Sequence, residues 1–170
     1  FKQELRGRAI ITSVEFTLQK NACARLLYGD LKKEVEAKGE ATLENIREVV
    51  CSIRRSKLPD TAILGNAGSF FKNPIIPLDE AEQMQAQYEN MPIYPAADSA
   101  YRKLAAGWLI DQSGMKGYRN GNVGVHTKQA LVLVNYGGAT GHEVINLAKE
   151  VQHRVKEKFG IAIEPEVNIL

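Results

Sequence analysis

The stretch from Thr140 to Gly160 carries the clearest helix signals in the sequence, one at each end. Thr140-Gly-His-Glu143 has the spacing of a capping box, in which two side chains satisfy backbone N–H groups at a helix start. Gly160 is the residue type that favours the left-handed backbone conformation at a helix end. Between these signals, apolar residues at helical spacing predict one buried stripe, formed by Val144, Leu147, Ala148, Val151 and Val155.

Short apolar runs that predict strands surround this helix in the chain. Two of them precede it, at 122–126 and 129–135, and residues 130–134 are apolar enough for a strand buried on both faces. Residues 9–18 alternate between apolar and polar side chains, which predicts a half-buried strand. The last segment, 161–170, alternates in the same way.

Three more helices are expected, at 42–58 with Thr42 as N-cap, at 78–88 and at 103–112. Residues 60–77 show the least regular pattern, and two prolines at 92–95 favour a turn around Tyr94. Strands and helices thus follow one another without regular βα repeats. This order predicts an α+β fold, with a single domain built on an antiparallel or mixed sheet and helices packed mainly on one side.

Composition excludes several classes of protein. The 170 residues are 44% apolar and 25% charged, which is ordinary globular usage and argues against a disordered tail or a coiled coil. No apolar run approaches the roughly 20 residues that cross a bilayer. The net charge of +2 is too small for a duplex-DNA binder and fits a small anionic ligand better. Two cysteines cannot form a disulfide framework, so we expect reduced thiols and a cytoplasmic protein.

The most unusual stretch is GNAGSFFKNP at 65–74. Its glycines let backbone N–H groups approach a ligand closely, and Ser69 beside them could donate a proton or act as a nucleophile. The stretch lacks the Gly-Lys-Ser/Thr ending of a P-loop and is not a Gly-x-Ser-x-Gly elbow. A serine in an ordinary turn remains the alternative, because Gly, Asn and Ser are common in turns.

The basic cluster at 54–57 and the carboxylate of Glu166 each allow a structural and a functional interpretation. Arg54, Arg55 and Lys57 either complement the dipole at a helix end or seat a phosphate or pyrophosphate. Glu166, on the polar face of the last segment, is either a solvated strand residue or, if buried near Ser69, a group for acid–base work. The three histidines have no metal-ligand spacing with each other or with the cysteines, so we expect no metal.

Four motifs together resemble a known family. GNAGSFFKNP at 65–74, KLPD at 57–60, KLAAGWLIDQ at 103–112 and EPEV at 164–167 are similar to UDP-N-acetylenolpyruvoylglucosamine reductase. The similarity runs in order through essentially the whole chain. The Leu-Tyr-Gly-Asp segment around Tyr28 resembles the subclass with a tyrosine-bearing loop over the substrate.

The resemblance implies a division of the chain into parts. Residues 1–18 would be a junction strand that continues from a missing FAD-binding region, 19–41 the tyrosine-bearing loop, and 42–170 the C-terminal substrate-binding domain. The family's catalytic arginine, in a Tyr-Arg-Asp-Ser segment, is expected just before Phe1. The chain alone is therefore expected to be inactive.

Site residues follow from the same resemblance, position by position. Ser69 matches the proton donor, and Glu166 matches the carboxylate that acts with the arginine on the enol intermediate. Further positions match contacts to the UDP-sugar and its diphosphate, namely Tyr28, Lys57, Asn73 and Gln129, with Tyr94 and Lys103 towards the nucleotide end. Asn168 departs from the family, in which arginine often follows the valine of the EPEV motif.

The implied reaction reduces UDP-N-acetylglucosamine enolpyruvate to UDP-N-acetylmuramate in bacterial peptidoglycan synthesis. It uses FAD, held by the missing region, and NADPH as the hydride source, in the cytoplasm, without nucleic acid, membrane or an obligate protein partner. A non-catalytic nucleotide-sugar binding module is the alternative, because the chain contains no cofactor motif. A single-stranded RNA binder using loop tyrosines is disfavoured by the nearly neutral charge.

Overall fold

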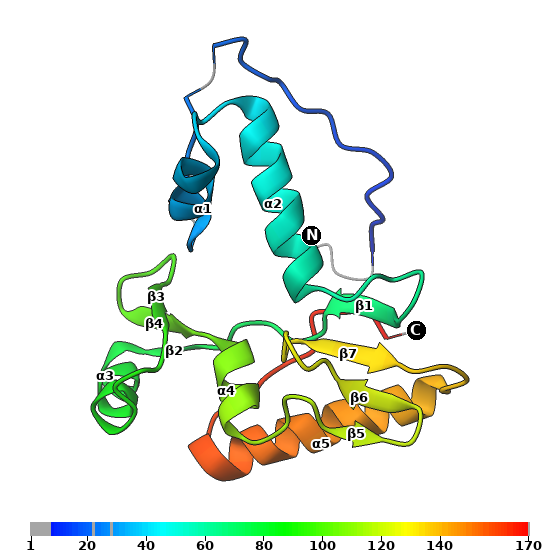
Figure 1. Ribbon diagram of the computed structural model, residues 1–170. Coiled ribbons are helices and arrows are strands. Elements are labelled where there is room, and N and C mark those ends of the chain that lie inside the picture. Colours follow the sequence, from blue (N-terminus) through cyan, green and yellow to red (C-terminus); the bar gives the residue numbers. More distant parts are fainter. Residues whose placement is uncertain (1–7, 22, 28, 170) are drawn as a thin grey trace. The chain divides into compact units, whose positions relative to one another are not determined.

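The computed structural model describes residues 8–21, 23–27 and 29–169. The chain divides into two compact units, Phe1–Val50 and Cys51–Leu170, and each is described here by itself. Figure 1 shows the order of the elements along the chain. Among the described residues, no helix combines the length and apolar character needed to cross a membrane.

The first unit contains helix α1 (Leu31–Lys38) and the start of α2 (Leu43–Lys57), which continues across the division. Val35 of α1 is fully buried. The Oγ1 atom of Thr42 accepts a hydrogen bond from the backbone N–H of Asn45 at 3.2 Å, which confirms the predicted N-cap. Lys38 and Glu48 form an ion pair between the two helices.

The strand predicted at 9–18 is not formed, which corrects the sequence-based expectation. These residues are irregular and exposed, and Ile10, Phe16 and Leu18 have exposed fractions of 90%, 78% and 84%. A strand needs a neighbour for its backbone hydrogen bonds. Within the described part of the chain, no segment pairs with 9–18.

A four-stranded antiparallel sheet lies in the second unit, with strand order β1-β7-β6-β5. Its strands are β1 (Gly65–Ser69), β5 (Arg119–Asn120), β6 (Val123–Val125) and β7 (Val132–Asn135). The runs predicted at 122–126 and 129–135 therefore do form strands. Val132, Leu133 and Val134 are all buried, as expected for a strand covered on both faces.

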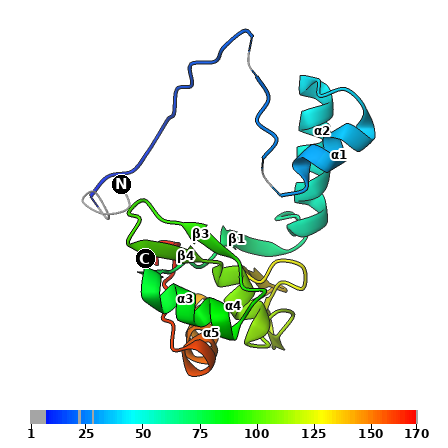
Figure 2. The ribbon, with the colours of Figure 1, turned by 90° about the vertical axis from the view of Figure 1, so that its left-hand side faces the viewer.

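A three-stranded antiparallel sheet has the order β2-β4-β3. Its strands are β2 (Ile75–Pro77), β4 (Tyr101–Leu104) and β3 (Ile93–Pro95). Helix α3 (Leu78–Gln87) follows β2 directly and confirms the helix predicted at 78–88. In Figure 2, α3, α4 and α5 lie on one side of β3 and β4, in agreement with the expected one-sided packing.

Helix α5 (Gly141–Phe159) packs along β6 and β7 (Figure 1) and has the predicted caps. Thr140 and Glu143 form the reciprocal capping box, and Gly160 adopts the left-handed conformation with φ of 71°. Four residues of the predicted stripe are buried, and Val144 is partly buried. One core joins residues of both sheets, of α5 and of the short helix α4 (Ala106–Gln112).

The α+β class is thus confirmed, but several local predictions are wrong. The stretch at 60–77 contains β1 and β2, the expected turn at 92–95 is β3, and the helix expected from Lys103 begins at Ala106 after β4. The strands that were not predicted, including β5, have two to five residues, too few to show a period of two. Gly and Asn in β1, and a proline at the end of both β2 and β3, also conceal the pairing that tertiary contacts enforce.

Candidate functional site

Ser69 is the last residue of β1, and an irregularity in that strand sets its position. Asn66 pairs with Val134, but Ser69 pairs with Val132, so β1 carries one extra residue between them. Gly68 occupies this bulge with φ of 73°, a conformation that glycine adopts readily. Its N–H donates to Asn66 Oδ1 at 3.0 Å. Ser69 is therefore exposed on the edge strand, and the bulge changes the direction of its side chain relative to a regular strand.

Two buried aromatic residues hold the backbone immediately after Ser69. Phe70 and Phe71 are 5% and 1% exposed, and their ring centroids lie 5.1 Å apart. The N–H of Phe70 donates to the carbonyl of Leu131 at 2.7 Å. Ser69 is therefore exposed on a segment that is itself fixed to the core.

Glu166 lies on the segment that pairs with this stretch. The N–H of Glu166 donates to the carbonyl of Phe70 at 2.8 Å, and the N–H of Lys72 donates to the carbonyl of Glu164 at 2.9 Å. Between these bonds, Phe71 and Pro165 form an antiparallel bridge. The structure thus brings the predicted pair, Ser69 and Glu166, onto neighbouring segments. Glu166 is exposed rather than buried.

Asn73 and Gln129 meet at the first turn of α4. Asn73 Oδ1 accepts a hydrogen bond from the N–H of Ala106 at 3.0 Å. Gln129 Oε1 would lie 3.5 Å from a Cβ atom placed on Gly107, and it accepts a bond from the N–H of Leu131 at 3.4 Å. Both predicted ligands therefore also fix the local fold. Asn73 bonds the segment after Ser69 to α4, and Gln129 bonds within the β6–β7 connection beside α4.

His126 stands at the start of the connection that carries Gln129. The backbone N–H of His126 donates to the carbonyl of Val132 at 2.9 Å. Its Nδ1 atom is buried, and none of the described residues gives it a hydrogen bond. Burial and, secondarily, the charge of Lys128 lower the pKa of His126. The imidazole is accordingly neutral at pH 7 and adds no cation beside Gln129.

Tyr94 and Lys103, predicted contacts for the same ligand, are direct partners across β3 and β4. Across the other edge of β4, Ile75 of β2 pairs with Lys103. The side chains of Tyr94, Lys103 and Ile75 therefore share one face of the sheet. This face is open to solvent, with Ile75 57% and Tyr94 48% exposed. The opposite face carries Ile76 and Leu104, which are buried.

Tyr101 was missed by the sequence analysis and lies on the same open face. It stands two residues before Lys103 on β4 and is 42% exposed. Alternating side chains on a strand point to one face, so the Tyr-x-Lys spacing could have revealed it once the strand was known. The helix expected from Lys103 concealed that spacing.

Lys57 is the last residue of α2 and is exposed, with Arg54 and Arg55 in the same final turn. The cluster therefore occupies a helix C-terminus, where positive charge is favourable in any case. A turn then leads to β1. In this turn, the backbone N–H of Leu64 donates to the carbonyl of Asp60 at 2.8 Å. Tyr28, the remaining predicted contact, lies outside the described residues.

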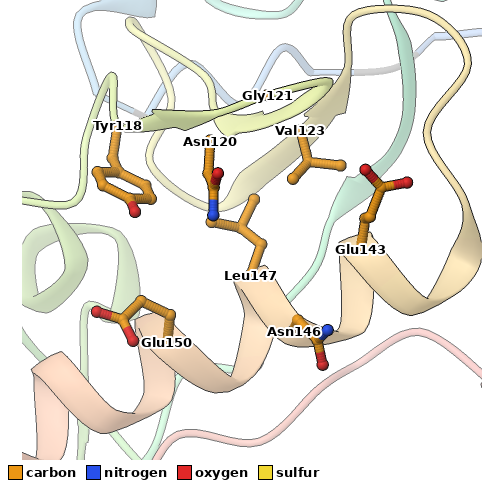
Figure 3. Close-up of a pocket in the computed structure, with 8 residues that line it drawn as sticks. All are labelled: Tyr118, Asn120, Gly121, Val123, Glu143, Asn146, Leu147 and Glu150. Carbon is orange, nitrogen blue, oxygen red and sulfur yellow. The ribbon is translucent and has the colours of Figure 1, made fainter.

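A pocket of about 340 Å³ lies between the β5–β6 hairpin and α5 (Figure 3). It contains none of the predicted site residues; its lining includes Tyr118, Asn120, Glu143 and Glu150. Hydrogen bonds from Thr140 engage Glu143 and lower its pKa, and Glu150 pairs with Arg154 at 2.8 Å. Its carboxylates therefore already have partners within the protein.

Among the described residues, no three His, Cys, Asp or Glu side chains lie close enough together to hold a metal ion. The arrangement instead offers a hydroxyl and a carboxylate on adjacent segments, with an open aromatic and cationic face elsewhere in the same unit. A hydroxyl can transfer a proton when a neighbouring group orients or relays it.

Residues 59–170 match the family model described as UDP-N-acetylenolpyruvoylglucosamine reductase, C-terminal domain. A UDP-N-acetylenolpyruvoylglucosamine reductase from Chromobacterium violaceum is 52% identical over 172 residues, covering 100% of this chain and 50% of that protein. One from Pseudomonas aeruginosa is 48% identical over 171 residues, covering 99% and 50%.

The crystal structure of the reductase from Thermus caldophilus superimposes with a TM-score of 0.46 and 25% identity, over 74% of this chain and 33% of that one. This chain spans about half the length of the curated relatives that it matches.

Proposed function

Because this chain belongs to the UDP-N-acetylenolpyruvoylglucosamine reductase family, we propose that it is the part of such a reductase that binds the substrate and protonates it. Family membership confirms the resemblance inferred from the motifs. The observation that carries the proposal is the pairing of residues 70–72 with 164–166, which places Glu166 beside the segment that follows Ser69.

The proposed substrate is UDP-N-acetylglucosamine enolpyruvate, and the bond that is reduced is the enolpyruvyl C=C. A hydride adds at C3, a proton adds at C2, and NADPH is oxidised to NADP⁺ overall. Ser69 is proposed to give the proton to C2, which requires a relay or a lowered hydroxyl pKa during the reaction. The position of Ser69, exposed on a rigid bulge, supports this role because the geometry is set before the substrate arrives.

Glu166 is proposed to act with a cation on the negative charge that develops towards the substrate carboxylate. A carboxylate alone would oppose that charge, so the proposal includes the arginine expected elsewhere in the complete protein. The main-chain bond from Glu166 to Phe70 supports the assignment because it fixes the glutamate relative to Ser69.

The pocket on α5 does not suit FAD, because Glu143 and Glu150 line it and carboxylates repel the diphosphate of a dinucleotide. This chain covers half the length of its relatives, and we propose that the hydride donor, FAD reduced by NADPH, is bound by the half that it does not cover. The role of the present residues is confined to the substrate and its proton.

Substrate binding is proposed to use the residues that match the family's ligand contacts. Lys57 supplies a point charge suited to the diphosphate, and Asn73 and Gln129 supply polar contacts near the sugar. Tyr94 and Lys103 contact the nucleotide end on the open face of the three-stranded sheet. Tyr28 is proposed as a further contact to the same ligand.

The test uses the complete protein that contains this chain, and we expect it to oxidise NADPH only when the enolpyruvyl substrate is present. Mass spectrometry should then find a product two hydrogen atoms heavier than the substrate. Residues 1–170 alone should bind the substrate in calorimetry without oxidising NADPH.

Two outcomes of this test would contradict the proposal. Substrate-stimulated NADPH oxidation by residues 1–170 alone would overturn the confinement of the chain to binding and protonation. Tight binding without oxidation by the complete protein would favour a non-catalytic nucleotide-sugar binding module.

A further inference from the structure

The segment that carries Glu166 is attached to the sheet by very few backbone bonds. Within the described part of the chain, two main-chain hydrogen bonds connect 164–166 to 70–72, and together they form the bridge between Phe71 and Pro165. A ladder of this length is short compared with an ordinary strand of 5–6 residues or so. Other contacts must therefore contribute to holding Glu166 in place.

One such contact comes from the side chain of Gln152 on α5. Its Nε2 atom donates to the carbonyl of Ile163 at 2.7 Å, across 11 residues of sequence. Gln152 is half-buried, and the side chain of Ile163 is only 2% exposed. This bond anchors the segment to the helix immediately before it reaches the sheet.

A second contact is the ion pair between Lys72 Nζ and Glu164 Oε2, at 3.4 Å. Their side chains are 34% and 73% exposed, and exposed pairs of this kind contribute little to stability. The bond from Gln152 is shorter and better shielded from water. Ile163 and Val167 also pack against the core. Of the two polar contacts from side chains, the one from Gln152 is therefore the stronger.

We propose that Gln152 is a positioning residue for Glu166, an inference that rests on the proposed role of Glu166 in the reaction. The carbonyl of Ile163 is partly shielded by the fold, and it loses its donor when the amide of Gln152 is removed. The segment from Ile163 to Glu166 then opens more often, and Glu166 leaves the place that the bond to Phe70 gives it.

Gln152→Met in the complete protein tests this directly, because methionine keeps the length of the side chain and removes the donor. Gln85→Met is the matched control. Gln85 lies on α3, and its Nε2 atom donates to the carbonyl of Met91 at 3.3 Å. Both variants lose one glutamine-to-carbonyl bond, but only the first is connected to the Glu166 segment.

Two measurements separate positioning from a general loss of stability. Hydrogen exchange at the amide of Glu166 should accelerate about 3- to 10-fold in Gln152→Met and stay unchanged in Gln85→Met. Turnover should fall about 10-fold or more in Gln152→Met with little change in KM, because a misplaced group acts on the chemical step. Gln85→Met should keep both constants.

Unchanged exchange at Glu166 in Gln152→Met would overturn the attachment itself. Faster exchange with unchanged turnover would overturn the positioning role, and Glu166→Gln then identifies the cause. Reduced turnover in Glu166→Gln leaves the proposed function standing and rejects only Gln152, whereas full turnover in Glu166→Gln rejects the role of Glu166 as well. If Gln152→Met does not fold, Gln152→Asn, whose amide is one methylene too short, is judged by the same outcomes.

Discussion

The Ser69–Glu166 region and the Tyr94–Lys103 face are built in different ways. In the first, two main-chain bonds join Lys72 to Glu164 and Glu166 to Phe70, 92 and 96 positions apart in sequence, and buried phenylalanines fix the backbone. In the second, short adjacent strands display side chains on an open face. A rigid backbone position suits groups that must meet reacting atoms, whereas an open face suits contacts that only hold a ligand. Variants in the first region should therefore affect turnover, and those in the second should affect KM.

The largest effect is expected from Ser69→Ala in the complete protein. Loss of the proton donor should lower kcat by about 10²- to 10⁴-fold, and KM should change little because the hydroxyl acts in the transition state. Steady-state kinetics with the enolpyruvyl substrate measures both constants. Unchanged kcat would show that Ser69 is not the acid. It would also contradict the expectation that the Ser69–Glu166 region controls turnover.

A smaller effect is expected from Tyr94→Leu, which removes the aromatic ring from the open face. An aromatic contact to a nucleotide base is worth about 1–3 kcal/mol, so KM should rise about 5-fold or more with kcat nearly unchanged. Tyr101→Leu, on the same face, is the matched comparison, and a smaller rise in KM is expected for it. An effect of Tyr94→Leu confined to kcat would contradict the assignment of this face to binding.

The smallest effect on activity is expected from Gly124→Ala, which belongs to neither region. A Cβ atom at Gly124 would lie 2.8 Å from the carbonyl oxygen of Tyr118 and 2.9 Å from the ring of Tyr136. Relieving these contacts should cost about 1–3 kcal/mol of stability. Thermal unfolding should occur several degrees lower, with kcat and KM unchanged where the protein is folded. A selective loss of either constant would show that the β5–β6 hairpin influences the site.

Much of the helical framework could be predicted because its signals are local. The caps at Thr42, Thr140 and Gly160 depend on residues within one helical turn, and the structure forms all three. The short strands could not be predicted in this way. In β1, glycine and asparagine indicate a turn, and only pairing with the apolar β7 makes the segment a strand.

The same distinction applies to the site. The motif around Ser69 and the carboxylate of Glu166 could be recognised in the sequence, but their proximity depends on a bridge between Phe71 and Pro165 that no local pattern encodes. The pairing of Tyr94 with Lys103 was concealed because Pro92 and Pro95 favoured a turn. The anchoring bond from Gln152 gave no sequence signal, because a glutamine on a helix is usually an ordinary surface residue.

The bridge between Phe71 and Pro165 also determines when the site can form during synthesis. The stretch after Ser69 leaves the ribosome long before its partner, and at about 5–20 residues per second the delay is several seconds or more. β1 pairs with β7, whose residues leave the ribosome before Pro165 does, so the sheet can begin to form while the site is still incomplete. Closing such a distant contact costs chain entropy that local contacts do not. Catalytic competence should accordingly appear after most of the native structure is present.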